Sequence, residues 1–216
     1  MSALSREVPI DPAHAALLII DVQNYCAGPE AGKTEYFRRS LRDAVLPNIR
    51  RLQSACRTGG IEVMYSVIEN MTRDGRDRSL DYKISGIDVL RSSWEARVLD
   101  EIAPADDEMI FRKTSSSVFI STNIDYVLRN LGARSLIITG VTTDQCVESA
   151  VRDACDLGYL VTLVTDACTT ASAERHEQSL IGIRGYCRQR TTDTLLTEIA
   201  ELTQSQWVSA AIPENP

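Results

Sequence analysis

The stretch that decides the fold is Ile137-Ile138-Thr139-Gly140-Val141-Thr142-Thr143-Asp144-Gln145-Cys146-Val147-Glu148-Ser149-Ala150. An apolar run of strand length stops at a glycine, a small polar turn follows, and a helical pattern begins with a cysteine in its first turn. A helix N-terminus carries partial positive charge and free backbone N–H groups, so a fold can hold a thiolate nucleophile there. Taken alone, however, a cysteine in this position is more often a small core residue.

The alternation of strand and helix continues on both sides of this segment. Apolar runs predict strands at 15–22, 61–68, 107–112, 135–139 and 159–165, and helical spacing predicts helices at 38–57, 123–131, 144–157 and 173–183, before a final strand and helix. Strands separated by helices of about 10–15 residues are typical of right-handed βαβ units and a parallel sheet with helices on both faces. We therefore expect one α/β domain over residues 1–216, with its core at about 15–200 and a fraying tail at 211–216.

Composition excludes several function classes. The 216 residues are 44% hydrophobic and 25% charged, with a formal net charge of −7, so no nucleic-acid partner is expected. No apolar run approaches the roughly 20 residues of a membrane span, so no membrane partner is expected either. The N-terminus lacks the basic and apolar regions of a signal peptide, which predicts a cytoplasmic location.

The cysteines and histidines give no metal or disulfide signature. The six cysteines are scattered without a C-x-x-C pair, at positions 26, 56, 146, 155, 168 and 187. In a cytoplasmic chain, the five other than Cys146 are expected to be free buried thiols. His14 and His176 are the only histidines, and neither has a second histidine at ligand spacing, so no metal and no cofactor are expected.

Three chemically reactive residues follow three of the predicted strands. Asp21 follows the apolar residues of the first strand, Lys113 follows Met109-Ile110-Phe111 and Cys146 follows Leu136-Ile137-Ile138. Open parallel sheets bind ligands at the carboxyl ends of their strands, so these side chains converge if the strands are neighbours. Each also has an ordinary interpretation: Asp21 as a helix cap, Lys113 as a surface lysine and Cys146 as a core residue.

Together the three residues make plausible catalytic chemistry. Cys146 would be the nucleophile, and the helix N-terminus and the Lys113 ammonium would favour its thiolate. Asp21 would take the thiol proton and later pass it to the leaving group or activate water. The turn from Val141-Thr142 to Cys146 would present backbone N–H groups to a developing oxyanion.

Three motifs carry a resemblance to a known family. They are Leu18-Ile19-Ile20-Asp21-Val22-Gln23-Asn24, Arg112-Lys113-Thr114-Ser115-Ser116-Ser117-Val118-Phe119 and Gly140-Val141-Thr142-Thr143-Asp144-Gln145-Cys146-Val147. In this order, over roughly residues 15–200, the chain resembles the isochorismatase-like cysteine hydrolases. The resemblance implies a Rossmann-like three-layer α/β/α fold with a six-stranded, mainly parallel sheet, a catalytic triad of Asp21, Lys113 and Cys146, and a homo-oligomer, either dimer or tetramer.

The resemblance also implies the details of the oxyanion hole. It places a cis peptide at Val141–Thr142 and assigns the oxyanion to the backbone N–H groups of Thr142 and Cys146.

Departures from subfamily patterns narrow the expected reaction. Nicotinamidase relatives carry an Asp-x-His…His metal site after the second strand, whereas this chain has Glu69-Asn70-Met71-Thr72-Arg73-Asp74-Gly75-Arg76 there, without histidine. Isochorismatases that cleave a vinyl ether lack the nucleophilic cysteine. The chain is therefore similar to amidohydrolases acting on small ureido or carbamoyl compounds, such as ureidoacrylate, N-carbamoylsarcosine, biuret and triuret.

The expected activity is cysteine-dependent hydrolysis of a non-peptide C–N bond, through a thioester-type intermediate with release of ammonia. Vinyl-ether hydrolysis and a catalytically silent small-molecule-binding protein are the alternatives.

Specificity residues are expected just beyond the strand ends. Tyr25, Glu69, Asn70 and Gln145 are the candidates, together with the polar 70–92 segment, which is predicted to be a long loop. The guanidinium groups of Arg73, Arg76 and Arg78 could bind a substrate carboxylate, or they could belong to a solvated loop or a subunit contact.

Overall fold

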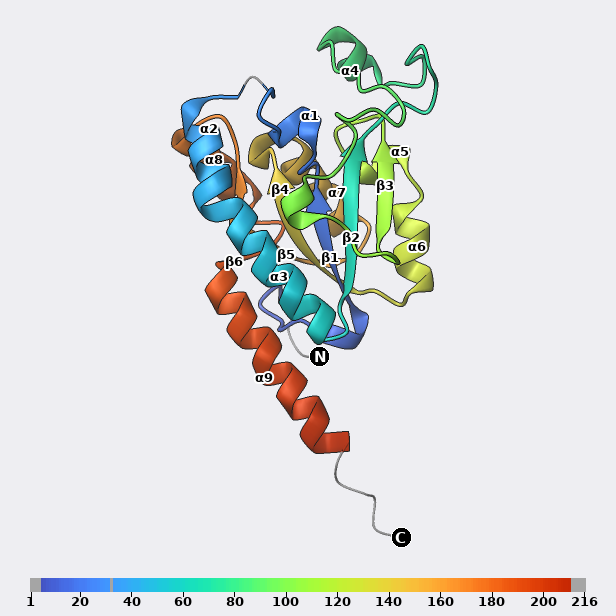
Figure 1. The fold of residues 1–216 in the computed structure, drawn as a ribbon. Helices are drawn as coiled ribbons and strands as arrows, with labels where there is room; N and C mark the ends of the chain where they lie inside the picture. The colour runs from blue at the N-terminus through green and yellow to red at the C-terminus, as the bar shows by residue number, and fades with distance from the viewer. Residues whose placement is uncertain (1–4, 32, 211–216) are drawn as a thin grey trace.

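A six-stranded parallel sheet forms the centre of the molecule (Figure 1). The computed structural model describes residues 5–31 and 33–210. The strands are β1 (Ala15–Ile20), β2 (Glu62–Ile68), β3 (Met109–Lys113), β4 (Ser135–Val141), β5 (Leu160–Thr169) and β6 (Arg188–Arg190). They lie in the order β3-β2-β1-β4-β5-β6, and every neighbouring pair is parallel. The expected α/β class with a six-stranded Rossmann-like sheet is confirmed.

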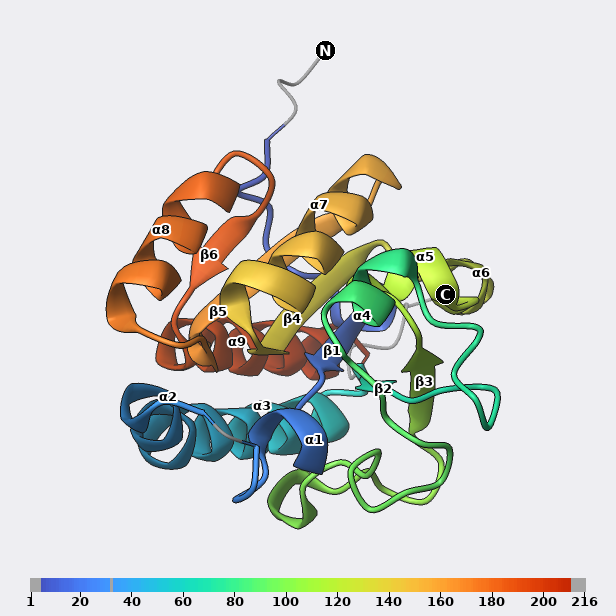
Figure 2. The same ribbon diagram turned by 90° about the horizontal axis from the view of Figure 1, so that it is seen from above.

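Helices cover both faces of this sheet, which completes the three layers (Figure 2). One face carries α2 (Glu35–Ser40), the π-helical turn η2 (Leu41–Val45), α3 (Leu46–Thr58) and α9 (Thr192–Ala210). The other carries α5 (Val118–Ser121), α6 (Ile124–Asn130), α7 (Glu148–Asp156) and α8 (Ala173–Ile183). Shorter turns are η1 (Pro12–His14), α1 (Asn24–Ala27), α4 (Leu80–Ile84), η3 (Asp100–Ile102) and η4 (Thr143–Val147). Within the described ranges, no helix is long and apolar enough to cross a bilayer.

The central strand β1 is buried on both sides, as its continuous apolar run predicts. Successive strand side chains point to opposite faces. Leu17 and Ile19 therefore pack into the core beneath α3 and α9, whereas Leu18 and Ile20 pack into the core beneath α6 and α7. This strand separates the two hydrophobic cores, so residues directly after it lie in the middle of the sheet edge.

Most expected elements are present, but the 70–92 segment differs from the prediction. The helix predicted at 38–57 is the longer run α2–η2–α3, which begins where the Thr34 hydroxyl accepts the Phe37 N–H. The segment expected to be an irregular loop contains α4, capped by the Ser79 hydroxyl, which accepts the Tyr82 N–H at 3.2 Å. That helix lies beyond the carboxyl ends of the strands (Figure 1), where the Ser79 N–H donates to the carbonyl of Thr114, the residue after β3, at 2.9 Å. The predicted fraying tail at 211–216 lies outside the described residues.

The adjacent strands β1 and β4 mark the point where the strand order reverses, and ligands bind at such a point in open α/β sheets. Gly140 of β4 lies opposite Ile20 of β1 and has a φ of +121°. A Cβ on Gly140 would stand 2.1 Å from the Ile20 carbonyl oxygen, so no side chain fits. The close approach of the Gly140 backbone to Ile20 keeps β1 and β4 side by side up to their carboxyl ends.

All six cysteines are free thiols. Four of the five assigned to the core are buried, namely Cys26, Cys56, Cys168 and Cys187. Cys155 is the exception, since it is half-buried on α7 rather than enclosed in the core.

Candidate active site

Asp21, Lys113 and Cys146 come together at the carboxyl edge of the sheet. The Lys113 Nζ lies 2.9 Å from Asp21 Oδ2 and 3.4 Å from Cys146 Sγ. Asp21 and Lys113 are 0% exposed and Cys146 is 7% exposed, so the group is almost fully removed from water. β3 is not adjacent to β1, because β2 lies between them, and the lysine side chain spans that strand.

The strand β2 fixes the carboxylate of Asp21. The Ser66 hydroxyl donates to Asp21 Oδ1 at 2.9 Å, and the Asp21 N–H donates to the Ser66 carbonyl at 3.0 Å. Asp21 has a φ of +54°, in the left-handed region that L-residues other than glycine rarely adopt. The backbone therefore turns sharply at the end of β1, and both hydrogen bonds keep this turn in place.

The Lys113 ammonium donates to three acceptors. These are the Tyr82 hydroxyl at 2.8 Å, the Ser115 carbonyl at 2.9 Å and Cys146 Sγ at 3.4 Å. Asp21 Oδ2 is within ion-pair distance of the ammonium but off the hydrogen-bonding angle, and no donor in the described part of the chain hydrogen-bonds to it. This oxygen is therefore free to accept a proton.

Tyr82 is a site residue that the sequence did not reveal. It lies on α4, within the segment predicted to be a loop, and its side chain is 1% exposed. Ser79 is a recognisable helix cap, which was the signal available for α4. Nothing in the local pattern indicates that Tyr82 turns inward, because that depends on where β3 and α7 lie.

Electrostatics at the site favour a protonated Cys146, which differs from the thiolate expected from sequence. Burial and the nearby Asp21 charge raise the pKa of the Cys146 thiol to about 12, although Lys113 acts in the opposite direction. Burial alone would lower the pKa of Lys113, but the charge of Asp21 and the thiol raise it well above its ordinary value. The resting site therefore holds a thiol beside an ion pair, and the thiol proton must leave as bond formation begins.

A cavity of about 390 Å³ opens onto this group. Its lining includes Asp21, Cys146 and the side chains of Tyr25, Lys33, Asp81, Tyr82, Thr142 and Gln145. Tyr25 and Gln145, two of the four predicted substrate-binding residues, thus line the cavity together with Asp21 and Cys146. The volume suits a small molecule rather than a polymer.

Glu69 and Asn70, the other two, do not line this cavity. Glu69 is buried and accepts the Ser92 N–H at 3.0 Å and the Arg112 Nε–H at 2.9 Å, beside a neighbouring hollow. Asn70 donates to the Asp88 carboxylate at 2.6 Å. Both side chains are occupied in shaping the 70–92 segment, so the geometry gives their substrate-binding assignment no support.

The arginines of the same segment also lie away from the cavity lining. Arg78 donates to the carbonyls of Gly75 and Ile87, each at 2.9 Å, and so holds the segment in shape. Arg76 pairs with Asp74 on the surface at 3.1 Å, and Arg73 is exposed. Of the interpretations open from sequence, a substrate clamp at Cys146 does not fit these positions. A solvated surface fits Arg73 and Arg76, and a subunit contact stays a prediction.

The turn between β4 and η4 carries the peptide bond inferred from the family resemblance. The Val141–Thr142 peptide is cis. The Thr142 hydroxyl donates to the Gln145 side-chain oxygen at 3.2 Å, which ties the turn to the first residues of η4. The oxyanion role of the Thr142 and Cys146 N–H groups stays a prediction.

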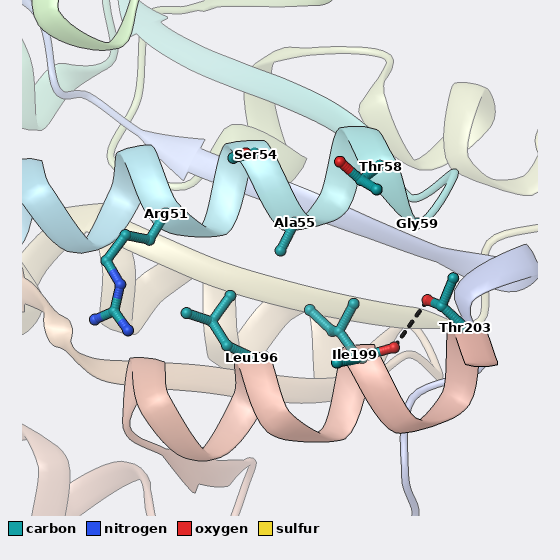
Figure 3. Close-up of a pocket in the computed structure, with 9 residues that line it drawn as sticks. Arg51, Ser54, Ala55, Thr58, Gly59, Leu196, Ile199 and Thr203 are labelled. Atoms are coloured by element: carbon teal, nitrogen blue, oxygen red, sulfur yellow. Dashed lines mark hydrogen bonds between the residues drawn. The ribbon is translucent and has the colours of Figure 1, made fainter. Parts of the chain in front are cut away.

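A larger hollow of about 590 Å³ lies elsewhere, between α3 and α9 (Figure 3). Leu196 and Ile199 of α9 face Ala55 of α3 across it. Its one charged lining residue, Arg51, is paired with Asp193 at 2.6 Å. This surface offers no nucleophile or proton carrier comparable with the Cys146 cavity.

Comparison with known proteins agrees with this geometry. A family model for the isochorismatase domain matches residues 15–197. The chain belongs to the isochorismatase domain family of hydrolases. Among curated relatives, the ureidoacrylate amidohydrolase RutB of Agrobacterium fabrum is 28% identical over 77% of this chain and 81% of its own. The RutB of Rhizobium rhizogenes is 27% identical over 77% of this chain and 75% of its own.

Two solved structures share the fold. A cysteine hydrolase from Pseudomonas syringae pv. phaseolicola superposes with a TM-score of 0.82 at 25% identity, covering 94% of this chain and 100% of that one. The N-carbamoylsarcosine amidase from Thermoplasma acidophilum superposes with a TM-score of 0.70 at 21% identity, covering 83% and 96% of the two chains.

In residues 5–31 and 33–210, no three His, Cys, Asp or Glu side chains gather in a way that could hold a metal ion. The expectation of metal-independent activity stays a prediction.

Proposed function

We propose that this isochorismatase-family hydrolase cleaves the C–N bond of a small amide, ureido or carbamoyl compound and releases ammonia. The observation that carries the proposal is the position of Cys146 Sγ, 3.4 Å from the Lys113 ammonium and beside the unoccupied Oδ2 of Asp21, in a small cavity. The relatives named as ureidoacrylate amidohydrolases support a C–N bond as the target.

The first half of the reaction forms a thioester-type intermediate. Cys146 Sγ attacks the carbonyl carbon while its proton passes to Asp21 Oδ2, and the π electrons of the carbonyl move to its oxygen. The backbone N–H groups of Thr142 and Cys146 donate to that oxyanion. When the oxyanion collapses, the C–N bond breaks, and the leaving nitrogen takes the proton from Asp21 and departs as ammonia.

The second half hydrolyses the intermediate. Asp21 accepts a proton from water as the water oxygen attacks the thioester carbon, and the C–S bond then breaks. The proton returns to the Cys146 sulfur, which restores the resting thiol. Lys113 stays an ammonium throughout, since its surroundings raise its pKa, and it stabilises negative charge on the sulfur and on Asp21.

A panel of small ureides, carbamoyl compounds and simple amides tests this function. We expect ammonia release from at least one member, together with a mass increase on Cys146 when the protein is quenched during turnover. Turnover of a vinyl ether such as isochorismate, without any ammonia-releasing substrate or Cys146 adduct, would instead support the alternative reaction.

Lys33 is expected to bind a carboxylate group of the substrate. It is half-buried at the cavity lining, and no carboxylate of the described residues pairs with it. We expect Lys33→Ala to lower kcat/KM for acidic ureides by about tenfold, because one charge-assisted contact is lost, and to leave neutral amides unchanged. Steady-state kinetics with matched acidic and neutral substrates check this.

Asp81 provides a control for Lys33, because its charge is opposite and its removal should change kcat/KM for acidic ureides in the opposite direction. It is an exposed carboxylate that lines the same cavity. Asp81→Asn removes repulsion and should raise kcat/KM for acidic ureides modestly. An equal loss on acidic and neutral substrates in the Lys33 variant would show that Lys33 shapes the cavity rather than binding a carboxylate.

A further inference from the structure

The hydroxyl of Tyr82 is part of the buried network around Lys113, although it lies on a separate helix above the sheet. It accepts a hydrogen bond from Lys113 Nζ at 2.8 Å and donates to the Ser115 carbonyl at 2.9 Å. Its oxygen is 4.0 Å from Cys146 Sγ. The tyrosine ring also lies 5.5 Å from the ammonium, measured to the ring centroid.

The hydrogen bond between Tyr82 and Lys113 matters because it takes up one of the three protons of the ammonium. An ammonium has three N–H donors, and here they go to Tyr82, Ser115 and Cys146. None remains for Asp21 Oδ2, although that oxygen is only 2.9 Å away. The Tyr82 proton is itself directed to Ser115, so the phenol oxygen faces the ammonium as an acceptor.

We propose that Tyr82 is a positioning residue, whose oxygen holds the Lys113 ammonium so that one N–H points at Cys146 and none points at Asp21 Oδ2. Asp21 thereby keeps an oxygen free for the thiol proton, and the sulfur keeps a donor that stabilises its developing negative charge. The proposal deepens the proposed function, since it concerns the same thiol and the same base.

Removing only the hydroxyl separates these effects from packing. Tyr82→Phe keeps the ring beside the ammonium, and the Ser115 carbonyl still accepts from Lys113. The freed N–H then turns to the nearest unoccupied acceptor, Asp21 Oδ2. A hydrogen bond there makes Asp21 a weaker base and draws the ammonium away from the sulfur.

Alkylation of Cys146 by iodoacetamide tests the proposal without any substrate. Peptide mass spectrometry gives the rates at pH 8 for Cys146 and, in the same molecules, for the half-buried Cys155. We expect Tyr82→Phe to slow Cys146 about tenfold and leave Cys155 unchanged. Once a substrate is known, kcat should fall in this variant while KM is retained.

Tyr65→Phe is the matched control. It also removes a buried hydroxyl, one that accepts from Gln53 at 2.6 Å and donates to Glu108 at 3.0 Å, but Tyr65 does not line the Cys146 cavity. We expect it to leave the ratio of the two alkylation rates at the wild-type value, even if it lowers the melting temperature.

Two results would overturn the proposal: Cys146 alkylated at the wild-type rate in folded Tyr82→Phe, or both thiols changing in parallel. If Tyr82→Phe does not fold, 3-fluorotyrosine placed at position 82 keeps the hydroxyl as a poorer acceptor. It should slow Cys146 by a smaller factor, and an unchanged rate overturns the proposal equally. Because the assay needs no substrate, its failure is distinct from failure of the proposed hydrolysis.

Discussion

Replacing Cys146 with alanine is expected to lower kcat/KM for the substrate by roughly 10⁴-fold or more. Without the sulfur, no thioester-type intermediate can form, and only substrate binding and the oxyanion donors remain to promote attack by water. Ammonia release under steady-state conditions measures the loss, and intact-mass spectrometry should show no adduct on the variant.

The control for this experiment is Cys155→Ala. It removes a half-buried thiol from α7 and should keep wild-type turnover. Both variants should remain folded, because alanine occupies less volume than cysteine. In Cys146→Ala the freed Lys113 N–H can turn to the nearby Asp21 Oδ2. Full activity in a folded Cys146→Ala protein would refute nucleophilic catalysis and favour direct attack by water.

The second large effect is expected from Asp21→Asn. The change is isosteric, but it leaves the Lys113 ammonium, which is 0% exposed, without its counter-charge. Breaking a buried pair in this way costs about 3–5 kcal/mol of unfolding free energy. Turnover should also be lost, because the base that takes the thiol proton is gone. Urea denaturation at pH 7 measures the stability change.

The stability of Asp21→Asn should depend on pH, because the pKa of Lys113 is shifted in opposite directions in the wild type and in the variant. In the wild type, the folded-state pKa of Lys113 is raised, so its stabilising contribution is present at neutral pH and lost only as pH rises through that raised value. In Asp21→Asn, burial without the carboxylate lowers the pKa of Lys113 below its unfolded value of about 10.4. The unfolded variant then binds more protons than the folded variant, so its free energy of unfolding rises with pH. The difference in unfolding free energy between wild type and variant should therefore narrow between pH 7 and pH 9.

A surface ion pair provides the comparison. Asp193→Asn breaks the ion pair with Arg51. The Asp193 side chain is 81% exposed and the Arg51 side chain is 50% exposed. This variant should lose less than about 1 kcal/mol and show no narrowing of the gap with pH. If Asp21→Asn behaved in the same way, the buried pair would not contribute as described.

The fold was predictable because its local and long-range signals agree. The continuous apolar runs at β1 and β4 are those of strands buried on both faces, and Gly132 and Gly158 end the helices that precede β4 and β5. The short elements were missed for the opposite reason. α1, α4 and α5 span only four or five residues each, too few for a helical period to show.

The site was predictable only where chemistry follows a strand. Asp21 directly follows β1, Lys113 ends β3 and Cys146 lies in the turn η4 after β4, and the rule for parallel sheets brings such residues to one edge. Tyr82 and Lys33 reach the cavity from connecting segments, whose path depends on tertiary packing. Glu69 also follows a strand, but the Arg112 side chain and the Ser92 N–H occupy its carboxylate, a pairing that one sequence does not reveal.

The place of β1 in the centre of the sheet also has a consequence for synthesis of the protein on the ribosome. β1 is the first strand to emerge, yet one of its edges has no partner until β4 at Ser135–Val141 has been made. Until then, a nascent chain with β1, β2 and β3 paired presents the open edge of its most apolar strand, and such edges recruit other chains. Translation pauses before β4 has emerged from the ribosome should therefore promote aggregation, whereas pauses after its emergence should have much less effect.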